Sequence, residues 1–418
     1  MKKMVITGGK TLTGEIKING AKNSSVALLP AAILSDDSST IYNVPDITDI
    51  DVLTKILVLL NCEVTKTNNS YKINTENIEN AIIPEEISKS LRASYYFMGA
   101  LLTKFKHVEI YFPGGCNFGA RQIDFHLKAF EDLGATIKEE NNKFTIDAEK
   151  LIGTDINLKF PSVGATINIM LASVKAEGIT TISNAAAEPE ILNVAVFLNS
   201  MGAKITGAGT KKIKIEGVKK LSSGKVGVIP DRIETGTYII AGALIGQNLK
   251  ISNINSIHIT ALLNTLDKMG AKYLLDENSI VISKAENLKP VNIETEVYPG
   301  FPTDLAQPIS VLLSKCDGIS KVTENIYEKR MGHVKYLNAM GANIKVEENK
   351  EIISGPIEFH GTDVEASDLR AGATLFLAAL TAKEETTITN VEYILRGYEK
   401  IVNKLSSVGA NIKLVEIK

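Results

Sequence analysis

The chain has 418 residues and is nearly neutral, with Lys+Arg 46 against Asp+Glu 48. This balance argues against nucleic acid or an anionic membrane surface as a partner, and the length predicts two or more domains. Three cysteines are too few and too odd in number for a disulfide framework. The start, "MKKMVITGGK", has no long apolar segment, and no apolar run approaches the roughly 20 residues of a membrane span. We therefore expect a cytoplasmic protein.

A glycine phrase recurs along the chain at a nearly constant interval. A typical copy is "SMGAKITGAGTKKIKI" (200–215), and a degenerate first copy is "LNCEVTKTNNSYKI" (60–73). The glycines of the other copies, spaced by 68, 68, 71 and 68 residues, are Gly134, Gly202, Gly270, Gly341 and Gly409. Six copies of a unit of about 70 residues indicate a repeat architecture. Each phrase predicts a helix end, a glycine C-cap and a β-hairpin.

Other stretches complete the predicted unit. Residues 123–133 have the spacing of an amphipathic helix. Stretches such as 94–105, 237–246 and 373–382 are apolar on almost every side and predict buried helices. A short strand-like phrase follows each such stretch, for example "TTISNA" (180–185). The unit thus reads strand, helix, strand, helix and two strands, and the chain predicts an α/β fold of two domains with three units each.

Cations stand where the predicted buried helices begin. They are Lys22, Arg92, Arg232 and Arg370, while Arg121 and Arg396 precede second helices of their units. Helix N-termini carry free N–H groups and attract anions, and arginine suits bidentate binding of phosphate and carboxylate. The repeated placement predicts a site for a small ligand that carries both groups. The alternative is that these residues are ordinary capping and solvated side chains.

Two aspartates stand among these cations. Asp304 in "FPTD" and Asp368 in "SDLR" stand at the same relative places in the fifth and sixth units. Neighbouring cations would keep such a carboxyl ionised, and an ionised aspartate facing a hydroxyl can act as a general base. An N-cap role explains an aspartate at a helix start equally well.

A lone cysteine lies in the glycine-rich stretch "FPGGCNFGAR" (112–121). Gly114, Gly115 and Gly119 predict a mobile lid, and a nearby arginine would favour the thiolate of Cys116 or hold an anion beside it. An adventitious loop thiol is the alternative. Cys62 and Cys316 are better explained by packing.

Motifs for metals and cofactors are missing from the sequence. The five histidines have no metal-ligand spacing, and there is no Walker A motif, no dinucleotide fingerprint and no CxxC. We therefore expect neither a metal nor a cofactor.

Several of these motifs together resemble the UDP-N-acetylglucosamine 1-carboxyvinyltransferase (MurA) family of enolpyruvyl transferases. The motifs occur in one order from about residue 3 to the C-terminus: "NGAKNSS", "LRAS", "PGGCNFGAR", "SVGATINIM", "PDRIETGT", "FPTD", "SDLRAGA" and "RGYEK". The resemblance implies a two-domain inside-out α/β barrel of six repeats. It also implies transfer of the enolpyruvyl group of phosphoenolpyruvate to the 3-hydroxyl of UDP-N-acetylglucosamine, with release of phosphate. This is the first committed step of peptidoglycan synthesis.

The resemblance also implies roles for individual residues. Cys116 would donate a proton and be the target of fosfomycin, and Asp304 would accept the proton of the sugar hydroxyl. The expected catalytic set is Cys116, Asp304, Lys22, Arg396 and Asp368. The phosphoenolpyruvate anion would contact Lys22, Asn23, Arg121, Arg370 and Arg396. The UDP-sugar would contact Arg92, Arg121, Gln122, Ile123, Asp124, Phe125, Ser162, Val163, Gly164, Asp304, Ile326, Glu328 and Arg330. One departure is Phe160, where some members have lysine; Lys159 stands one place earlier.

Domain limits are expected near the points where the chain crosses between domains. One domain would comprise residues 1–20 plus 230–418, with the first strand completing its sheets. The other would comprise 21–229 and carry the catalytic loop. Two functional alternatives remain: the sister enzyme that acts on shikimate 3-phosphate, and a catalytically silent paralogue that binds UDP-sugar and regulates the pathway.

Overall fold

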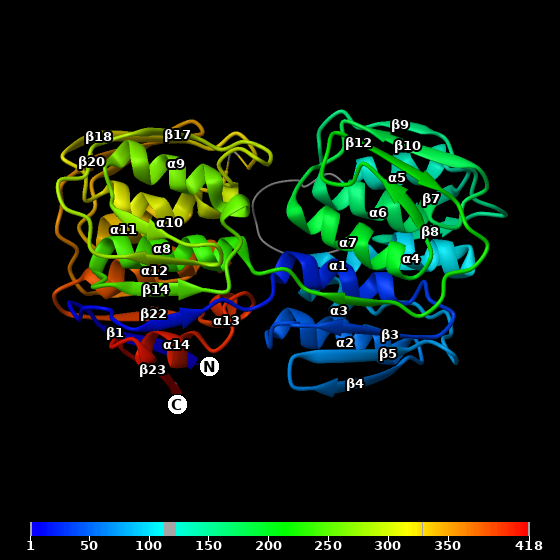
Figure 1. Cartoon of the computed structure of the whole chain (residues 1–418), viewed down its shortest axis with the longest axis horizontal. Coiled ribbons are helices and arrows are strands. Elements are labelled where there is room, and N and C mark those ends of the chain that lie inside the picture. Colours follow the sequence, from blue (N-terminus) through cyan, green and yellow to red (C-terminus); the bar gives the residue numbers. More distant parts are fainter. Residues whose placement is uncertain (1, 113–122, 328, 417–418) are drawn as a thin grey trace. The chain divides into compact units, whose positions relative to one another are not determined.

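A computed structural model describes residues 2–112, 123–327 and 329–416 of the chain. Internal contacts divide it into two compact units (Figure 1). The split unit consists of Met1–Asn19 and Pro230–Lys418, and the continuous unit consists of Gly20–Ile229. The predicted limits differ from these only in the assignment of Gly20.

The continuous unit contains three copies of the strand–helix pattern. Its helices are α1 (Lys22–Ala32), α2 (Thr48–Leu59), α3 (Glu85–Ser90), η1 (a 3-10 helix, Arg92–Tyr95), α4 (Tyr96–Phe105), α5 (Asp124–Asp132), α6 (Val163–Ser173) and α7 (Pro189–Ser200). Its strands are β3 (Ser38–Tyr42), β4 (Glu63–Thr67), β5 (Ser70–Asn74), β6 (His107–Tyr111), β7 (Thr136–Glu140), β8 (Lys143–Asp147), β9 (Asp155–Asn157), β10 (Ile179–Ser183), β11 (Lys204–Thr206), β12 (Lys212–Glu216) and β13 (Lys225–Gly227).

The split unit repeats the same pattern. Its helices are α8 (Arg232–Ile245), η2 (a 3-10 helix, Ser256–Ile259), α9 (Thr260–Met269), α10 (Thr303–Leu313), α11 (Val334–Ala339), α12 (Leu369–Thr381), α13 (Glu392–Leu395) and α14 (Ile401–Ser407). Its strands are β1 (Lys2–Thr7), β2 (Glu15–Lys17), β14 (Leu249–Ser252), β15 (Tyr273–Leu275), β16 (Ser279–Ile282), β17 (Asn292–Glu294), β18 (Gly318–Thr323), β19 (Ile344–Glu347), β20 (Lys350–Gly355), β21 (Asp363–Glu365), β22 (Glu385–Thr389) and β23 (Asn411–Glu416).

Six small sheets are formed by the described strands, three in each unit. In the continuous unit the strand orders are β13-β3-β5-β4, β6-β8-β7 and β11-β12-β10-β9. In the split unit they are β15-β16-β14-β2, β17-β18-β20-β19 and β21-β22-β1-β23. The predicted hairpins are present, for example β11 with β12. On β12, Ile213 and Ile215 are buried while Lys212 and Lys214 are exposed, so the predicted alternation is correct.

The N-terminal strands belong to the split unit, as expected. β1 lies between β22 and β23, antiparallel to both, and supplies the hairpin partner that the last repeat lacks. β2 pairs in parallel with β14. The chain's first and last strands are therefore neighbours in one sheet, with Lys2 opposite Glu416.

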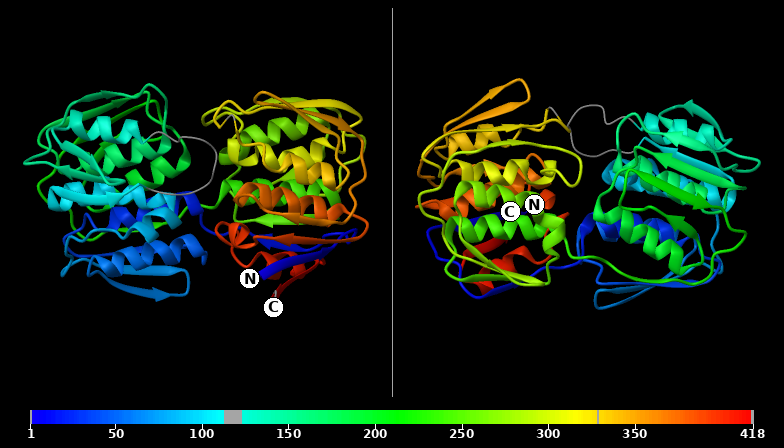
Figure 2. Two further views of the ribbon diagram at one scale, coloured as in Figure 1. Left: turned by 180° about the vertical axis from the view of Figure 1, so that it is seen from behind. Right: turned by 45° about the horizontal axis from the view of Figure 1, so that its top comes forward.

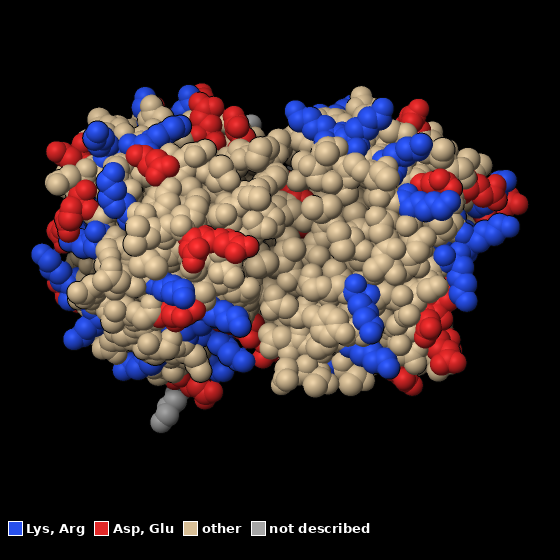
Figure 3. Space-filling view, viewed as in Figure 1, with Lys and Arg blue, Asp and Glu red and all other residues tan. Residues whose placement is uncertain are grey.

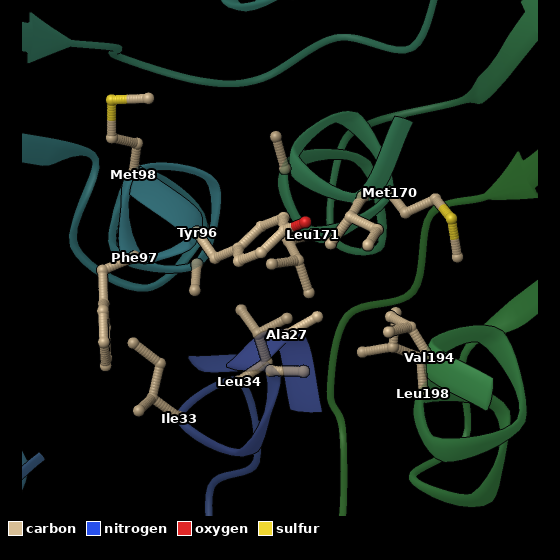
Figure 4. Close-up of a cluster of buried hydrophobic side chains, with 14 of the residues drawn as sticks. Ala27, Ile33, Leu34, Tyr96, Phe97, Met98, Met170, Leu171, Val194 and Leu198 are labelled. Atoms are coloured by element: carbon tan, nitrogen blue, oxygen red, sulfur yellow. The ribbon is translucent and has the colours of Figure 1, made fainter. Parts of the chain in front are cut away.

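The apolar helices form the interior of each unit, and the sheets cover them (Figures 1 and 2). In the continuous unit, side chains of α1, α4, α6 and α7 meet in one cluster, which includes Phe97, Met98 and Leu198 (Figure 4). In the split unit, α8, α10 and α12 form the corresponding core, with Tyr238 and Phe376 fully buried. The prediction that these helices are buried on all sides is confirmed.

The glycine phrase ends helices in the predicted way. Gly270 caps α9 with φ 85°, and Gly409 follows α14 with φ 101°. This left-handed conformation costs glycine little because it has no Cβ. In the degenerate first copy Asn61 takes the position with φ 61°, and asparagine is among the residues that tolerate it.

Charge of both signs is interspersed on the face shown in Figure 3, in keeping with the net charge of −2. None of the helices in the described part of the chain combines the length and apolarity that crossing a membrane requires.

Candidate active-site residues

The four cations predicted at the starts of buried helices do lie at helix starts. Lys22 is the first residue of α1, Arg92 of η1 and Arg232 of α8, and Arg370 is the second residue of α12. The helices begin there because extended residues precede them, and Asp231 caps α8 by accepting hydrogen bonds from two backbone N–H groups. The helix-start part of the prediction is therefore correct.

Asp304 lies between two arginines in the split unit. Its Oδ1 accepts a hydrogen bond from Nη1 of Arg330 at 2.8 Å, and its Oδ2 accepts one from Nη2 of Arg370 at 2.8 Å. The arginine side chains are each 5% exposed and that of Asp304 is 22% exposed. Burial alone raises the pKa of Asp304, but the two guanidiniums outweigh it and hold this pKa well below its usual range. Asp304 is therefore a carboxylate at any physiological pH.

Asp368 has a different place from Asp304. It is the N-cap of α12, and its Oδ1 accepts hydrogen bonds from the backbone N–H groups of Arg370 and Ala371 at 2.8 and 3.1 Å. Asp304 is the second residue of α10, which Pro302 precedes as N-cap. The expected equivalence of the two aspartates is therefore wrong: the capping explanation describes Asp368, which is 1% exposed, but not Asp304.

Two other predicted cations of the split unit are Arg232, which lies near an aromatic ring, and Arg396, which lies at the end of a helix. The guanidinium of Arg232 lies 5.7 Å from the ring centroid of Tyr298, in the range of a cation–π contact. Arg396 directly follows α13 and is half-buried.

In the continuous unit, Lys22 forms an ion pair with Asp49. Its Nζ lies 2.7 Å from Oδ2 of Asp49, and the side chains are 14% and 4% exposed. Asp49 lies in the first turn of α2, where a carboxylate is favoured. Asn23 follows Lys22 in α1 and is half-buried. The sequence reasoning missed Asp49; its position in the first turn of an amphipathic helix was the available signal.

The start of α6 packs closely on aromatic side chains. Ser162 is its N-cap and accepts a hydrogen bond from Ala165 N–H at 3.3 Å. A Cβ on Gly164 would lie 2.8 Å from the hydroxyl of Tyr95 and 3.0 Å from Cε1 of His126. A larger residue has no room there, so glycine at position 164 allows the start of α6 to pack closely against Tyr95 and His126.

His126 is a neutral, buried member of this group. Burial, with a further contribution from Arg92, lowers the pKa of His126 to about 3. Asn168 Nδ2 donates to its Nδ1 at 2.8 Å, which leaves the ring proton on Nε2. Tyr95 links His126 to the predicted residue Arg92, since its ring lies 5.9 Å from the Arg92 guanidinium and 4.9 Å from the His126 ring. Sequence reasoning found no role for this histidine.

Other predicted residues are placed as follows. Ile123 precedes α5, and Asp124 and Phe125 begin it. Ile326 follows β18 and is half-buried. Phe160, at the departure from the family pattern, is 39% exposed. Cys116, Arg121, Gln122 and Glu328 lie outside the described residues.

Candidate metal ligands do not cluster: within residues 2–112, 123–327 and 329–416, no three His, Cys, Asp or Glu side chains are arranged to hold an ion. Cys62 and Cys316 are buried free thiols, and burial raises the pKa of each to about 11. Their interpretation as packing residues agrees with this environment.

Known proteins are similar to this chain in both sequence and fold. The sequence model of the EPSP synthase (3-phosphoshikimate 1-carboxyvinyltransferase) family matches residues 6–405. UDP-N-acetylglucosamine 1-carboxyvinyltransferase 2 of Streptococcus mutans is 47% identical over 418 residues, which is 100% of both chains. The chain belongs to the UDP-N-acetylglucosamine 1-carboxyvinyltransferase family. The enzyme of that name from Geobacillus kaustophilus is 48% identical over 412 residues, covering 99% of this chain and 96% of its own.

Solved structures of enolpyruvyl transferases have the same fold. The enolpyruvyl transferase NikO of Streptomyces tendae matches with a TM-score of 0.91 and 24% identity, covering 100% of this chain and 99% of its own. EPSP synthase of Acinetobacter baumannii matches with a TM-score of 0.76 and 16% identity over 100% of both chains. The expected enolpyruvyl transferase fold is confirmed.

Proposed function

We propose that this member of the family transfers the enolpyruvyl group of phosphoenolpyruvate to the 3-hydroxyl of UDP-N-acetylglucosamine and releases phosphate. The observation that carries the proposal is full-length identity of 47% with a relative that bears the corresponding name. EPSP synthase, in contrast, shares the fold at 16% identity. The reaction would be the first committed step of peptidoglycan synthesis. Its place would be the cytoplasm, where buried cysteines such as Cys62 and Cys316 stay reduced.

The proposed chemistry is addition followed by elimination. The sugar 3-oxygen attacks C2 of phosphoenolpyruvate and loses its proton to Asp304, while C3 gains a proton from Cys116. The tetrahedral intermediate would then return a proton from C3 to the Cys116 thiolate and expel phosphate, which would take up the proton held by Asp304. The elimination restores the double bond in the product. Lys22 and Arg396 would hold the anion of phosphoenolpyruvate, because preorganised cations stabilise charge that shifts during a reaction.

The arginine pair of Asp304 bears on its role as a base. A carboxylate held by two guanidiniums is a weak base, since its pKa lies well below the usual range. Arg370 belongs to the set proposed to bind phosphoenolpyruvate. If its guanidinium is shared with the substrate anion, Asp304 becomes more basic when the donor substrate is bound. Proton removal would then be coupled to the presence of the second substrate.

Several residues are proposed to contact the acceptor, UDP-N-acetylglucosamine. In the continuous unit, the proposed contacts include Arg92 and the segment from Ser162 to Gly164. The start of α6 suits the phosphates, since helix N-termini bind anions. In the split unit, Ile326 and Arg330 would meet the sugar together with Asp304.

Phosphate release from phosphoenolpyruvate tests the proposal. We expect release with UDP-N-acetylglucosamine and none with shikimate 3-phosphate. Release with shikimate 3-phosphate alone would assign the chain to the sister reaction. Binding of UDP-N-acetylglucosamine without any release would identify a silent, regulatory protein. Fosfomycin should inactivate the wild-type enzyme, whereas a Cys116→Ala variant should form no covalent adduct with it.

A further inference from the structure

Glu324 is a buried carboxylate that joins three segments of the split unit. It directly follows β18 and is 2% exposed. Its Oε1 accepts hydrogen bonds from the Thr295 hydroxyl and from the backbone N–H groups of Ile326 and Tyr327, at 2.8, 2.8 and 3.0 Å. Its Oε2 accepts a hydrogen bond from the Thr303 hydroxyl at 2.7 Å. These four donors are neutral, and together they satisfy a carboxylate that burial would otherwise make costly.

Thr303 connects this carboxylate to the arginine beside Asp304. A hydroxyl has one proton, and Thr303 directs it to Glu324. Its oxygen therefore accepts the hydrogen bond from Nη1 of Arg330, at 3.0 Å. The same Nη1 donates to Asp304 at 2.8 Å. Glu324 thus sets the direction of the Thr303 hydroxyl, and the hydroxyl holds one end of the guanidinium against the proposed base.

The turn after β18 depends on the same carboxylate. Ile326 carries a proposed contact to the UDP-sugar, and its N–H is bound by Glu324. The side chain of Asn349 adds a hydrogen bond from Nδ2 to the backbone oxygen of Glu324, at 3.1 Å. One buried side chain therefore touches the segments that carry Asp304, Arg330 and Ile326.

We propose that Glu324, acting through Thr303 and through the backbone of residues 326–327, is the positioning residue of the acceptor-sugar half of the site. It sets where Asp304, Arg330 and Ile326 meet the sugar and does not itself contact the reacting atoms. The inference rests on the proposed function, because it gives Glu324 a role in binding the sugar of that reaction. It predicts that disturbing Glu324 or Thr303 affects UDP-N-acetylglucosamine and leaves phosphoenolpyruvate binding nearly unchanged.

Substitutions of Thr303 test this prediction with little change of shape. Thr303→Val keeps the branched side chain but removes the hydroxyl, whereas Thr303→Ser keeps the hydroxyl. We expect Thr303→Val to lower kcat/KM for UDP-N-acetylglucosamine by about 10- to 100-fold, the range for a lost hydrogen bond to a charged group. The KM for phosphoenolpyruvate should change by less than about threefold, and Thr303→Ser should restore most of the lost efficiency. Glu324→Gln should act in the same direction, since one carboxylate acceptor becomes a donor.

Thr381→Val is the matched control. Thr381 lies in α12 of the same unit and donates its hydroxyl to Ala378 O at 2.9 Å, so the variant loses a hydroxyl without touching this network. Thermal unfolding of all variants separates a loss of folded protein from a change in binding. Equal loss of efficiency in Thr303→Val and Thr303→Ser would overturn the inference. So would an unchanged kcat/KM for UDP-N-acetylglucosamine in both Thr303→Val and Glu324→Gln.

The proposed function and this inference fail in different ways. A wild-type protein that releases no phosphate refutes the proposed reaction. Calorimetric titration with UDP-N-acetylglucosamine then decides on Glu324. Weaker binding by Thr303→Val than by the wild type and Thr303→Ser supports the positioning role, and equal affinity of all three, or no binding by the wild type, overturns it.

Discussion

Replacing Asp304 by asparagine should destabilise the split unit and show how strongly its charge is held. Arg330 and Arg370 are each 5% exposed and share this one carboxylate. Without it, both nearly buried guanidiniums lose the carboxylate that they share, while the more weakly acting charges of Asp368 and Asp231 remain near Arg330 and Arg370, respectively. Breaking a buried ion pair from one side costs about 3–5 kcal/mol. Because Asp304 is 22% exposed, we expect the lower end of that range, about 3 kcal/mol.

The pH dependence of this loss has a definite sign. The folded pKa of Asp304 is held well below the value of about 3.9 that aspartate has in an unfolded chain. Its stabilising contribution is therefore complete above about pH 4 and is lost only as the pH falls further, toward the folded pKa. The difference in unfolding free energy between wild type and Asp304→Asn should be constant from about pH 8 to pH 5.

Equilibrium urea unfolding at several pH values measures this difference. Asp317→Asn is the matched control, since Asp317 is exposed in the same unit and should change stability by less than about 0.5 kcal/mol. The reasoning is refuted if Asp304→Asn is as stable as the wild type at pH 7. It is also refuted if the difference has already disappeared at pH 5, because the carboxyl would then titrate near its ordinary pKa.

Three further predictions concern the continuous unit. Asp49→Asn should raise the KM for phosphoenolpyruvate by about tenfold, because Lys22 loses a charged partner at 2.7 Å. Steady-state kinetics would measure this KM, with Asp46→Asn as the control because Asp46 is exposed. A KM equal to that of the wild type would exclude Asp49 from the site. The free energy of unfolding of the wild type should decrease as the pH falls from about 6.5 toward the folded pKa of His126, about 3, because only the unfolded chain then takes up the proton. In urea unfolding, His126→Gln should lack this pH dependence. Gly164→Ala should weaken UDP-N-acetylglucosamine binding by about tenfold or more in calorimetry, because the added Cβ would lie 2.8 Å from a tyrosine hydroxyl.

The repeat was predictable because its signals are local. A glycine after a helix, an alternating strand and an apolar helix are each encoded within a dozen residues, and six copies reinforce one another. The position of Arg92 and Arg232 at helix starts follows from the same local pattern. The choice of reaction came from the resemblance, because the local pattern predicts that anions are bound but does not indicate which ones.

Neighbouring residues control the repeating units, the α/β class, the buried helices and the cations at helix starts, so all of these could be predicted from the sequence. Which side chains meet depends on tertiary packing. Arg330 and Arg370 reach Asp304 from different segments, 26 and 66 residues away, and Asp368 caps α12 while Asp304, two places further into its helix, does not cap α10. The carboxylate of Glu324 likewise gains its partners from strand, turn and helix. Such contacts depend on how separate elements pack. A shift of one or two residues along a helix changes the direction of a side chain, so that a carboxylate contacts a neighbouring segment and no longer the backbone of its own helix.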